Sequence, residues 1–316
     1  MIIPSSIQQY IPLADKNWFA SGGLARFFAL PKTAADFQEA IQFAKDFDIS
    51  LFLLGKGANI LIADEGFDGL IIQPQLTEIT VVQENSTHIW IKAGAGVSLD
   101  ILITWCLNHQ IVGLEEFSGI PGTVGGAVYI NLHYFEFLLQ QFLSAAEIID
   151  AKTSIIQSVD NEWFAFDYDY SKLHERNHYL ATATFQLTKA SIEQTAFAKG
   201  RSIEIIRHRA RRYPQKNTCG SFFRNFHDHE VHLTIDGKKI IYAAYYLDKL
   251  GVKGTLKYGG AQVSSQHANM IINTGNATSN DIVTLARIMQ EMVLNEFGII
   301  PQPECQLLGF DMNILL

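Results

Sequence analysis

The spacing of hydrophobic residues predicts a chain that mixes helices with short strands. Over 33–47, apolar residues recur every three or four positions, and Thr33 with Asp36 fits a capping box at the start of a helix. The same period predicts helices over 99–109 and 280–297. Short apolar or alternating runs predict strands at 51–54, 66–73, 79–83, 88–93, 179–187, 231–235 and 238–240.

Turn signals join some of these runs into hairpins. Polar residues 84–87 separate two of the strand-like runs, and Asp236-Gly237 is a strong hairpin turn signal between two others. A strand–helix–strand pattern opens the chain, and a basic, mostly helical stretch over 199–216 follows a change in character near residue 190. The pattern therefore predicts a mixed α+β fold with a soft domain boundary around 190–200.

Composition narrows the class of protein. Hydrophobic residues make up 48% of the 316 and charged residues 18%, which excludes a disordered chain. The 24 Lys and Arg against 32 Asp and Glu give a net charge of −8, which argues against a general nucleic-acid binder. Cys106, Cys219 and Cys305 have no metal-binding spacing. With no secretory signal and no apolar run of about 18 residues, we expect a soluble cytoplasmic protein with no metal and no membrane partner.

Two glycine-rich loops are the first candidate binding elements. One spans 53–61 directly after a predicted strand, and the other spans 119–127. Glycines let the backbone approach a ligand and direct N–H groups at phosphate oxygens, although each loop alone fits a tight turn equally well. Ile60 stands where a dinucleotide fingerprint has its third glycine, and no Walker pattern is present. The pair favours one shared pyrophosphate and disfavours a Rossmann fold.

Several motifs together resemble one family, the UDP-N-acetylenolpyruvoylglucosamine reductases. They stand in the family's order and with family-like spacing, at 17–23, 55–69, 113–127, 219–225, 259–269 and Pro303-Glu304. The chain length and the lack of a long insertion resemble the shorter, second type of the family. The resemblance covers nearly the whole chain and is more specific than either glycine loop.

This resemblance implies a fold, cofactors and a substrate. Residues 1–195 would form an FAD-binding domain of the vanillyl-alcohol-oxidase type, with two α/β subdomains divided near residue 74. Residues 196–316 would form an α+β substrate-binding domain. The implied activity is NADPH-dependent reduction of the UDP-sugar enolpyruvate in peptidoglycan precursor synthesis. The residues implied to bind the FAD are Gly55, Lys56, Gly57, Ala58, Asn59, Ile60, Gly119, Ile120, Thr123, Gly125, Gly126 and Ala127.

Reduction of an enolpyruvyl ether is a conjugate addition, which needs an acid over one carbon and groups that stabilise an enolate. By resemblance, Ser221 donates the proton and Glu304 assists the enolate; outside such motifs, they would be a turn serine and one more acid. The arginines of the basic run fit either a solvated helix face or phosphate contacts. The residues implied to bind the substrate, with the nicotinamide phosphate as the other candidate ligand of the arginines, are Tyr168, Arg209, Arg212, Asn225 and Gln262.

The sequence departs from the family at two places. Asp169 stands where the family's Tyr-Arg-x-Ser motif has its arginine, and an aspartate there would oppose the enolate charge. Our hypothesis is that Lys172 or Arg176 supplies the cation. The segment 131–136 is bulkier than usual, and we expect its His133 to be packed or hydrogen-bonded. The alternatives are a divergent flavin oxidoreductase and a non-catalytic nucleotide-sugar-binding homologue; a monomer is favoured.

Overall fold

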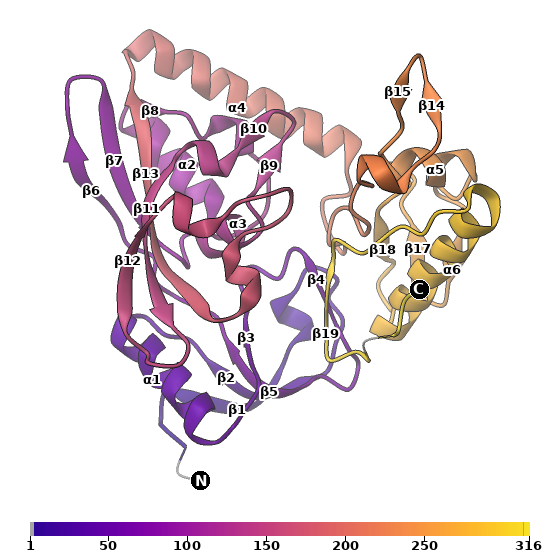
Figure 1. Ribbon diagram of the computed structural model, residues 1–316, viewed down its shortest axis with the longest axis horizontal. Helices are drawn as coiled ribbons and strands as arrows, with labels where there is room; N and C mark the ends of the chain where they lie inside the picture. The colour runs from indigo at the N-terminus through magenta and orange to yellow at the C-terminus, as the bar shows by residue number, and fades with distance from the viewer. Residues whose placement is uncertain (1–2, 312) are drawn as a thin grey trace. The chain divides into compact units, whose positions relative to one another are not determined.

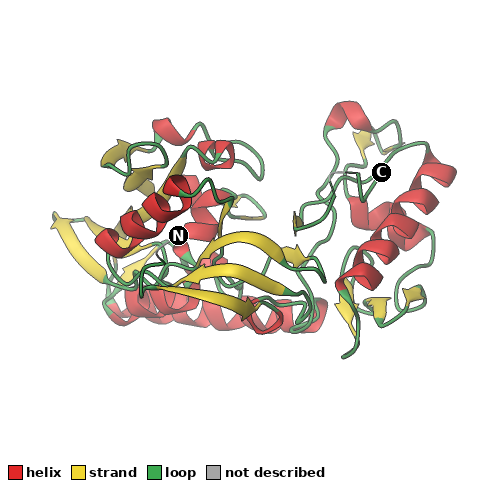
Figure 2. Ribbon diagram, turned by 90° about the horizontal axis from the view of Figure 1, so that it is seen from below, coloured by secondary structure: helices red, strands yellow, loops and turns green. Residues whose placement is uncertain are grey.

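The computed structural model describes residues 3–311 and 313–316, and the chain divides into two compact units. The first unit holds the residues up to Tyr10, Phe27–Lys56 and Gly69–Arg209. The second unit holds Ile11–Arg26, Gly57–Asp68 and Ala210–Leu316. Helices and strands alternate in both units, as Figure 2 shows, which confirms the predicted α+β class.

A four-stranded sheet and helix α1 begin the first unit. The strand order is β1-β2-β5-β3, with β3 parallel to β5. Helix α1, Ala34–Asp46, buries its apolar side in a core with residues of this sheet. The predicted capping box is present, because Thr33 accepts from the Asp36 N–H and Asp36 accepts from the Thr33 N–H. The strands of this sheet are β1 Ile7–Pro12, β2 Leu24–Ala29, β5 Phe67–Ile72 and β3 Leu51–Leu53.

A larger antiparallel sheet forms the rest of the first unit (Figure 1). Its strands follow the order β12-β11-β13-β7-β6, and the short β8 pairs with the far end of β13. The predicted hairpin is confirmed as β6 paired with β7. The bounds are β6 Ile79–Glu84, β7 His88–Gly94, β8 Ile111–Val112, β11 Leu143–Asp150, β12 Ile156–Asp160 and β13 His178–Lys189, and a small separate hairpin consists of β9 His133–Tyr134 and β10 Phe137–Leu138.

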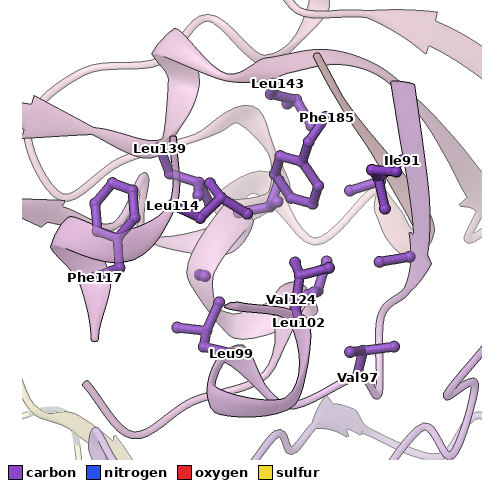
Figure 3. Close-up of a cluster of buried hydrophobic side chains, with 14 of the residues drawn as sticks. Ile91, Val97, Leu99, Leu102, Leu114, Phe117, Val124, Leu139, Leu143 and Phe185 are labelled. Carbon is purple, nitrogen blue, oxygen red and sulfur yellow. The ribbon is translucent and has the colours of Figure 1, made fainter. Parts of the chain in front are cut away.

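Two helices form a common core with this sheet. Helix α2, Leu99–Asn108, matches its predicted range, and the short α3, Val124–Tyr129, follows the second glycine loop. Ile91 and Phe185 from paired strands share one hydrophobic cluster with residues of both helices, as Figure 3 shows. The glycine loop that precedes α3 is therefore held against a rigid core.

The second unit is assembled from distant parts of the chain. Strand β4, Ile60–Ile62, pairs in parallel with β19, Gln306–Leu308. Helix α6, Ser279–Phe297, has a capping box of Thr278 and Asp281 and packs in one core with α5 and a three-stranded sheet. The predicted turn at Asp236-Gly237 closes a hairpin, with strands shorter than expected. The remaining bounds are α5 Ala243–Lys249, β14 Thr234–Ile235, β15 Lys238–Lys239, β16 Lys257–Tyr258, β17 Ala261–Val263 and β18 Ile271–Asn273.

Helix α4, Ile192–Arg212, is the long helix predicted in the basic stretch, and it begins earlier than the sequence indicated. Among residues 3–311 and 313–316, no helix is both long and apolar enough to cross a membrane. Within the same residues, His, Cys, Asp and Glu side chains do not gather into a group of three that could hold a metal ion.

Candidate active site

The first glycine loop begins where β3 ends, and in the first unit its start lies against the second loop. A Cβ placed on Gly55 would come within 2.8 Å of the Thr123 hydroxyl oxygen. The Gln73 side chain donates to the Gly55 carbonyl at 2.7 Å. Lys56 forms an ion pair with Asp100 of α2 at 2.7 Å. The structure therefore brings together the two loops that the sequence singled out.

The second glycine loop uses part of its own backbone internally. Thr123 caps α3 by accepting from the Gly126 N–H at 3.2 Å, and the Gly125 N–H donates to the Ala95 carbonyl at 2.9 Å. A Cβ on Gly125 would lie 3.1 Å from that same carbonyl oxygen. A Cβ on Gly126 would have only the Thr123 hydroxyl nearby, at 3.7 Å. Gly125 therefore serves packing, whereas Gly126 leaves open space beside the loop.

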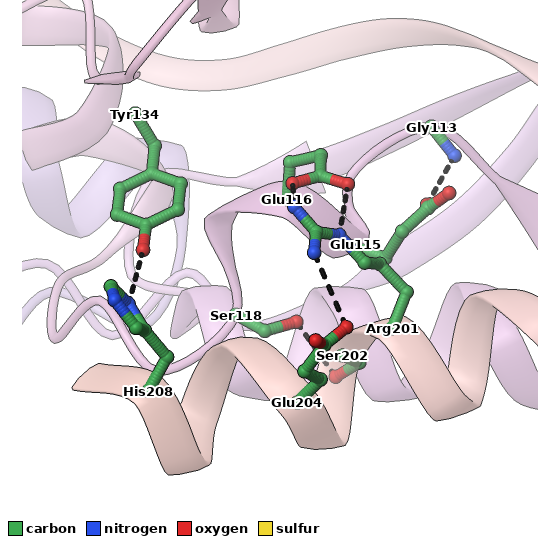
Figure 4. A network of polar contacts seen from close by, with 9 residues as sticks. All are labelled: Gly113, Glu115, Glu116, Ser118, Tyr134, Arg201, Ser202, Glu204 and His208. Atoms are coloured by element: carbon green, nitrogen blue, oxygen red, sulfur yellow. Dashed lines mark hydrogen bonds and ion pairs between the residues drawn. The ribbon is translucent and has the colours of Figure 1, made fainter. Parts of the chain in front are cut away.

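Helix α4 fixes the chain that leads into this loop, as Figure 4 shows. Arg201 grips the half-buried region through a two-point contact with Glu116, with nitrogen–oxygen distances of 2.8 and 3.0 Å. One turn along, the hydroxyl groups of Ser118 and Ser202 are 2.7 Å apart. Paired guanidinium–carboxylate contacts fix direction as well as distance. The start of the second loop is thus tied to a long helix.

Arg209 continues this set of contacts. Its Nε donates to the Gly119 carbonyl at 3.2 Å, and its guanidinium lies 5.5 Å from the centre of the Tyr134 ring. The Tyr134 hydroxyl is 3.4 Å from Nδ1 of His208 (Figure 4). A predicted ligand-binding arginine therefore also positions the second glycine loop. Ile120, the next predicted contact, is half-buried against the core, and Ala127 is buried within α3.

The two departures from the family pattern contact each other. Tyr168 and Asp169 form the tip of a tight turn in which Asp167 and Tyr170 exchange main-chain hydrogen bonds. Asp169 has φ of +51°, a left-handed conformation that aspartate adopts more readily than most residues. Its Oδ1 is 3.4 Å from Nδ1 of His133, whose ring lies 5.1 Å from that of Tyr168. His133 is therefore a contact residue, as expected.

The two cations proposed to replace the missing arginine have other contacts. Lys172 Nζ lies 5.1 Å from the centre of the Trp163 ring. The Arg176 guanidinium lies 5.8 Å from the centre of the Phe52 ring. His133 is the cationic-capable side chain whose contact with Asp169 is seen at 3.4 Å.

In the second unit, the segments of Ser221 and Glu304 are side by side. The Glu304 N–H donates to the Phe222 carbonyl at 2.9 Å. Phe223 forms an antiparallel bridge with Pro303, so the pairing extends in both directions from that bond. The two predicted catalytic residues are 83 positions apart in sequence, and the fold makes them neighbours along paired backbone.

Asn269 anchors the serine segment, a role that we did not assign from the sequence although Asn269 lies in one of the matching motifs. Its main-chain carbonyl accepts from the Phe222 N–H at 2.8 Å, and its Oδ1 accepts from the Phe223 N–H at 3.1 Å. Its Nδ2 donates back to the Phe223 carbonyl at 2.7 Å. Three bonds from one buried residue fix the backbone directly after Ser221.

Asn59 connects the end of the first glycine loop to the Glu304 segment. Its Nδ2 donates to the Glu304 carbonyl at 3.3 Å, and its own carbonyl accepts from the Gln306 N–H at 3.1 Å. Its Oδ1 is buried without a hydrogen-bond partner among the described residues. Buried polar atoms are normally paired, so this oxygen fits an acceptor for a bound group. Ala58 is half-buried beside it, and Ile60 is buried at the start of β4.

Gly57 has a structural reason of its own. Its φ is +65°, and a Cβ there would lie 2.3 Å from the Lys16 carbonyl oxygen. Gln262 donates to the Gly254 carbonyl at 2.8 Å, and the Asn225 carbonyl accepts from Arg224 at 2.8 Å. These two predicted substrate contacts are therefore held by main-chain groups of the second unit.

Arg212 lies beside a buried histidine at the end of α4. His267 packs its ring against Tyr213 at 5.5 Å, and its Nδ1 accepts from the Asn269 N–H at 3.3 Å. Burial, followed by the positive charges of Arg212 and Lys253, lowers the pKa of His267 to about 4. Because Nδ1 is an acceptor, the neutral ring carries its proton on Nε2. His267 is therefore a neutral hydrogen-bond donor in a positively charged region.

Comparison with known proteins assigns the family. A model for the C-terminal domain of UDP-N-acetylenolpyruvoylglucosamine reductase matches residues 212–308, and an FAD binding domain model matches residues 25–158. The reductase of Protochlamydia amoebophila is 33% identical over 314 residues, which cover 99% of this chain and 97% of that protein. The chain belongs to the UDP-N-acetylenolpyruvoylglucosamine reductase family.

Further members of the reductase family agree with this assignment. A UDP-N-acetylenolpyruvoylglucosamine reductase from a Synechococcus strain is 32% identical over 309 residues, covering 96% of this chain and 94% of that protein. The solved UDP-N-acetylenolpyruvylglucosamine reductase of Thermus caldophilus superposes with a TM-score of 0.76 and 24% identity, covering 96% of this chain and 99% of that one. The predicted combination of an FAD-binding fold and a reductase C-terminal domain is confirmed.

The residues of the two glycine loops fit a dinucleotide. Gly126 leaves space that a side chain would fill, and the buried Asn59 Oδ1 lacks a donor among the described residues. Gly55 lies against Thr123, so the loops can contact the same group. The donor set is neutral and glycine-rich, as expected for a diphosphate approached by main chain.

Proposed function

We propose that this chain reduces the enolpyruvyl group of UDP-N-acetylglucosamine enolpyruvate to UDP-N-acetylmuramate, with NADPH as the reductant. The reaction belongs to peptidoglycan precursor synthesis, and we place it in the cytoplasm with the UDP-sugar as its small-molecule partner. Membership of the reductase family supports this function. When bound, FAD supplies the hydride that the substrate receives and recovers it from NADPH.

The residues proposed to hold FAD come from both glycine loops. Gly55 and Lys56 open the first loop, and Asn59 ends it with an oxygen that awaits a donor. In the second loop, the open side of Gly126 admits the diphosphate. We propose that the Lys56–Asp100 ion pair holds the loop in position rather than neutralising a phosphate, because its charge is already balanced at 2.7 Å.

Ser221 and Glu304 carry the proposed chemistry at the substrate. Hydride addition at one carbon leaves an enolate on the carboxylate side, and Ser221 Oγ gives its proton to the adjacent carbon. Glu304 assists the enolate at the same centre. The observation that carries this assignment is the hydrogen bond from the Glu304 N–H to the Phe222 carbonyl, 2.9 Å long, which holds Glu304 beside the serine segment. Serine is a weak acid, so such a fixed position is essential.

The anionic parts of the ligands need cations. We propose that Arg212, beside the neutral donor His267, contacts a diphosphate or the nicotinamide phosphate. Arg209 contributes by fixing Gly119. We further propose that residues 196–316 act as the substrate-binding domain, with Asn225, Gln262 and the Tyr168 ring as further substrate contacts, and that the chain acts as a monomer.

An anaerobic half-reaction tests this function. The flavin of the purified protein is reduced, UDP-N-acetylglucosamine enolpyruvate is added, and reoxidation is followed by absorbance with product identified by mass. We expect rapid reoxidation by the wild type and a rate about 10² to 10⁴ lower for Ser221→Ala, because a positioned acid contributes that much. Ser265→Ala, at an exposed position of the same unit, is the control. A Ser221→Ala rate within about threefold of wild type would exclude the proposed proton donor.

One observation favours a second candidate. Asp169 presents a carboxylate where the family pattern has a cation, and its Oδ2 is buried with no partner among the described residues. A divergent flavin oxidoreductase with a less anionic substrate would tolerate this charge. A flavin that NADPH reduces but the UDP-sugar enolpyruvate leaves reduced would favour that alternative.

A further inference from the structure

Two of the three cysteines flank the proposed catalytic residues. Cys219 precedes Ser221 by two positions, and Cys305 directly follows Glu304. Both are buried in the core of the second unit, with 6% and 3% of their surface exposed. Cys106 is equally buried, but it lies in the core of the first unit. The chain therefore has a cysteine pair at one place and a matched single cysteine at another.

The two thiols of the pair interact. The Cys219 side chain is hydrogen-bonded to that of Cys305, and burial, followed by this contact and the charge of Glu304, raises the pKa of Cys219. The main chain holds them in this arrangement, because the Cys305 N–H donates to the Phe222 carbonyl at 3.2 Å. Their closeness is thus a property of the paired backbone and not of flexible side chains.

The chain before Ser221 can adjust. Gly220 separates Cys219 from Ser221 with φ of +81°, and a Cβ placed on it would meet no atom within 4 Å. A change at Cys219 can therefore be taken up by rotation at Gly220 without a clash. The segment after Ser221 cannot move in the same way, since Asn269 holds it at Phe222 and Phe223.

We propose that Cys219 and Cys305 form an oxidisable dithiol, which a hydroperoxide converts to a disulfide that joins the Ser221 and Glu304 segments. One thiol, as its thiolate, attacks the peroxide oxygen and becomes a sulfenic acid while the alcohol or water leaves. The second thiol displaces the sulfenic hydroxyl as water and forms the sulfur–sulfur bond. Overall, two thiols and one hydroperoxide give one disulfide, one alcohol (water when hydrogen peroxide is used) and one further water.

Burial sets the conditions of this reaction. The thiolate is the attacking form, and the raised pKa of Cys219 keeps that thiol protonated near neutral pH. The dithiol is therefore slow to oxidise at pH 7 and faster at pH 9. Bond formation brings the sulfurs to about 2.05 Å, closer than two thiols in contact, so Cys219 must move and Ser221 moves with it. The predicted loss of catalysis rests on the proposed function; the disulfide itself does not.

Peroxide treatment of the flavin-loaded protein tests the proposal. Wild type, Cys106→Ser and Cys219→Ser are exposed to hydrogen peroxide at pH 7 and pH 9, unfolded in an alkylating reagent and weighed, and the peptides are mapped. We expect wild type and Cys106→Ser to lose two alkylatable thiols together, with a cross-linked peptide pair that contains Cys219 and Cys305. Dithiothreitol should restore both thiols. If Cys219→Ser does not fold, Cys305→Ser replaces it.

The outcomes separate the disulfide from its effect. A cross-linked pair that forms faster at pH 9 supports the proposal. Oxygen adducts on single cysteines, a bridge that includes Cys106, or two thiols that stay reduced in folded protein at both pH values would overturn it. In the half-reaction, we expect reoxidation to slow about tenfold or more after cross-linking and to recover on reduction. Unchanged reoxidation with a proven cross-link would overturn the coupling to Ser221, and a reductase without UDP-sugar activity would refute the proposed function alone.

Discussion

The stability of this protein should fall between pH 7 and pH 5 because of His267. The folded chain keeps this ring neutral, since burial and the charges of Arg212 and Lys253 lower its pKa to about 4, while Asp248 acts in the opposite direction. The Nδ1 contact with the Asn269 N–H also requires the unprotonated nitrogen. In the unfolded chain, the same ring returns to a pKa of about 6.5.

The sign follows from which state binds the proton first. As the pH falls below about 6.5, the unfolded chain takes up a proton that the folded chain refuses until about pH 4. The free energy of unfolding therefore decreases over this window and is fully present only above it. For these two values, the His267 contribution between pH 7 and pH 5 is about 2 kcal/mol.

Urea unfolding at pH 7, 6 and 5, followed by tryptophan fluorescence, measures this contribution. We expect His267→Asn, whose side-chain oxygen can accept from the same N–H, to lose about 2 kcal/mol less than wild type over that range. His232→Asn, at an exposed position of the same unit, is the matched control. If His267→Asn and wild type showed equal losses, the neutral buried histidine would be refuted.

Three further predictions concern packing, a helix start and an ion pair. Phe185→Ala, at a fully buried position, should lower the free energy of unfolding by about 3 to 5 kcal/mol in urea, and a loss below about 1 kcal/mol would contradict its place in the core. Thr278→Ala removes half of the capping box of α6 and should cost about 1 kcal/mol, whereas Thr278→Ser should cost little. A double-mutant cycle on Glu116 and Arg201 should give a coupling of about 1 kcal/mol that weakens at high salt; a coupling of zero would show that the pair seen here does not persist in solution.

Local patterns predicted the elements whose hydrophobic period is self-contained. Helix α1 was predicted together with its capping box, because Thr33, Asp36 and the buried face lie within one short stretch. The antiparallel pairing of β6 with β7 followed in the same way from two runs and a turn. These elements need no distant partner to reveal their type.

Other parts depended on partners far away in sequence. Strands β4 and β19 have three residues each, and neither run shows a period before it meets the other. Asn269 lay inside a matching motif, but its three bonds to Phe222 and Phe223 became visible only in three dimensions. The contact between His133 and Asp169 was equally hidden, although both residues had been noted separately. Sequence patterns identify candidate residues, and non-local pairing decides which of them meet.

The parallel pairing of β4 with β19 also sets the timing of folding. Residues 60–62 leave the ribosome long before residues 306–308, so β4 must wait for its partner strand. At a synthesis rate of about 10 residues per second, this wait is roughly 20 s. Throughout that time, the apolar segments of the second unit near residues 19 and 61 are without most of their core. A newly made chain is therefore most prone to aggregate through these early segments, and it reaches safety only when its last strand has been made.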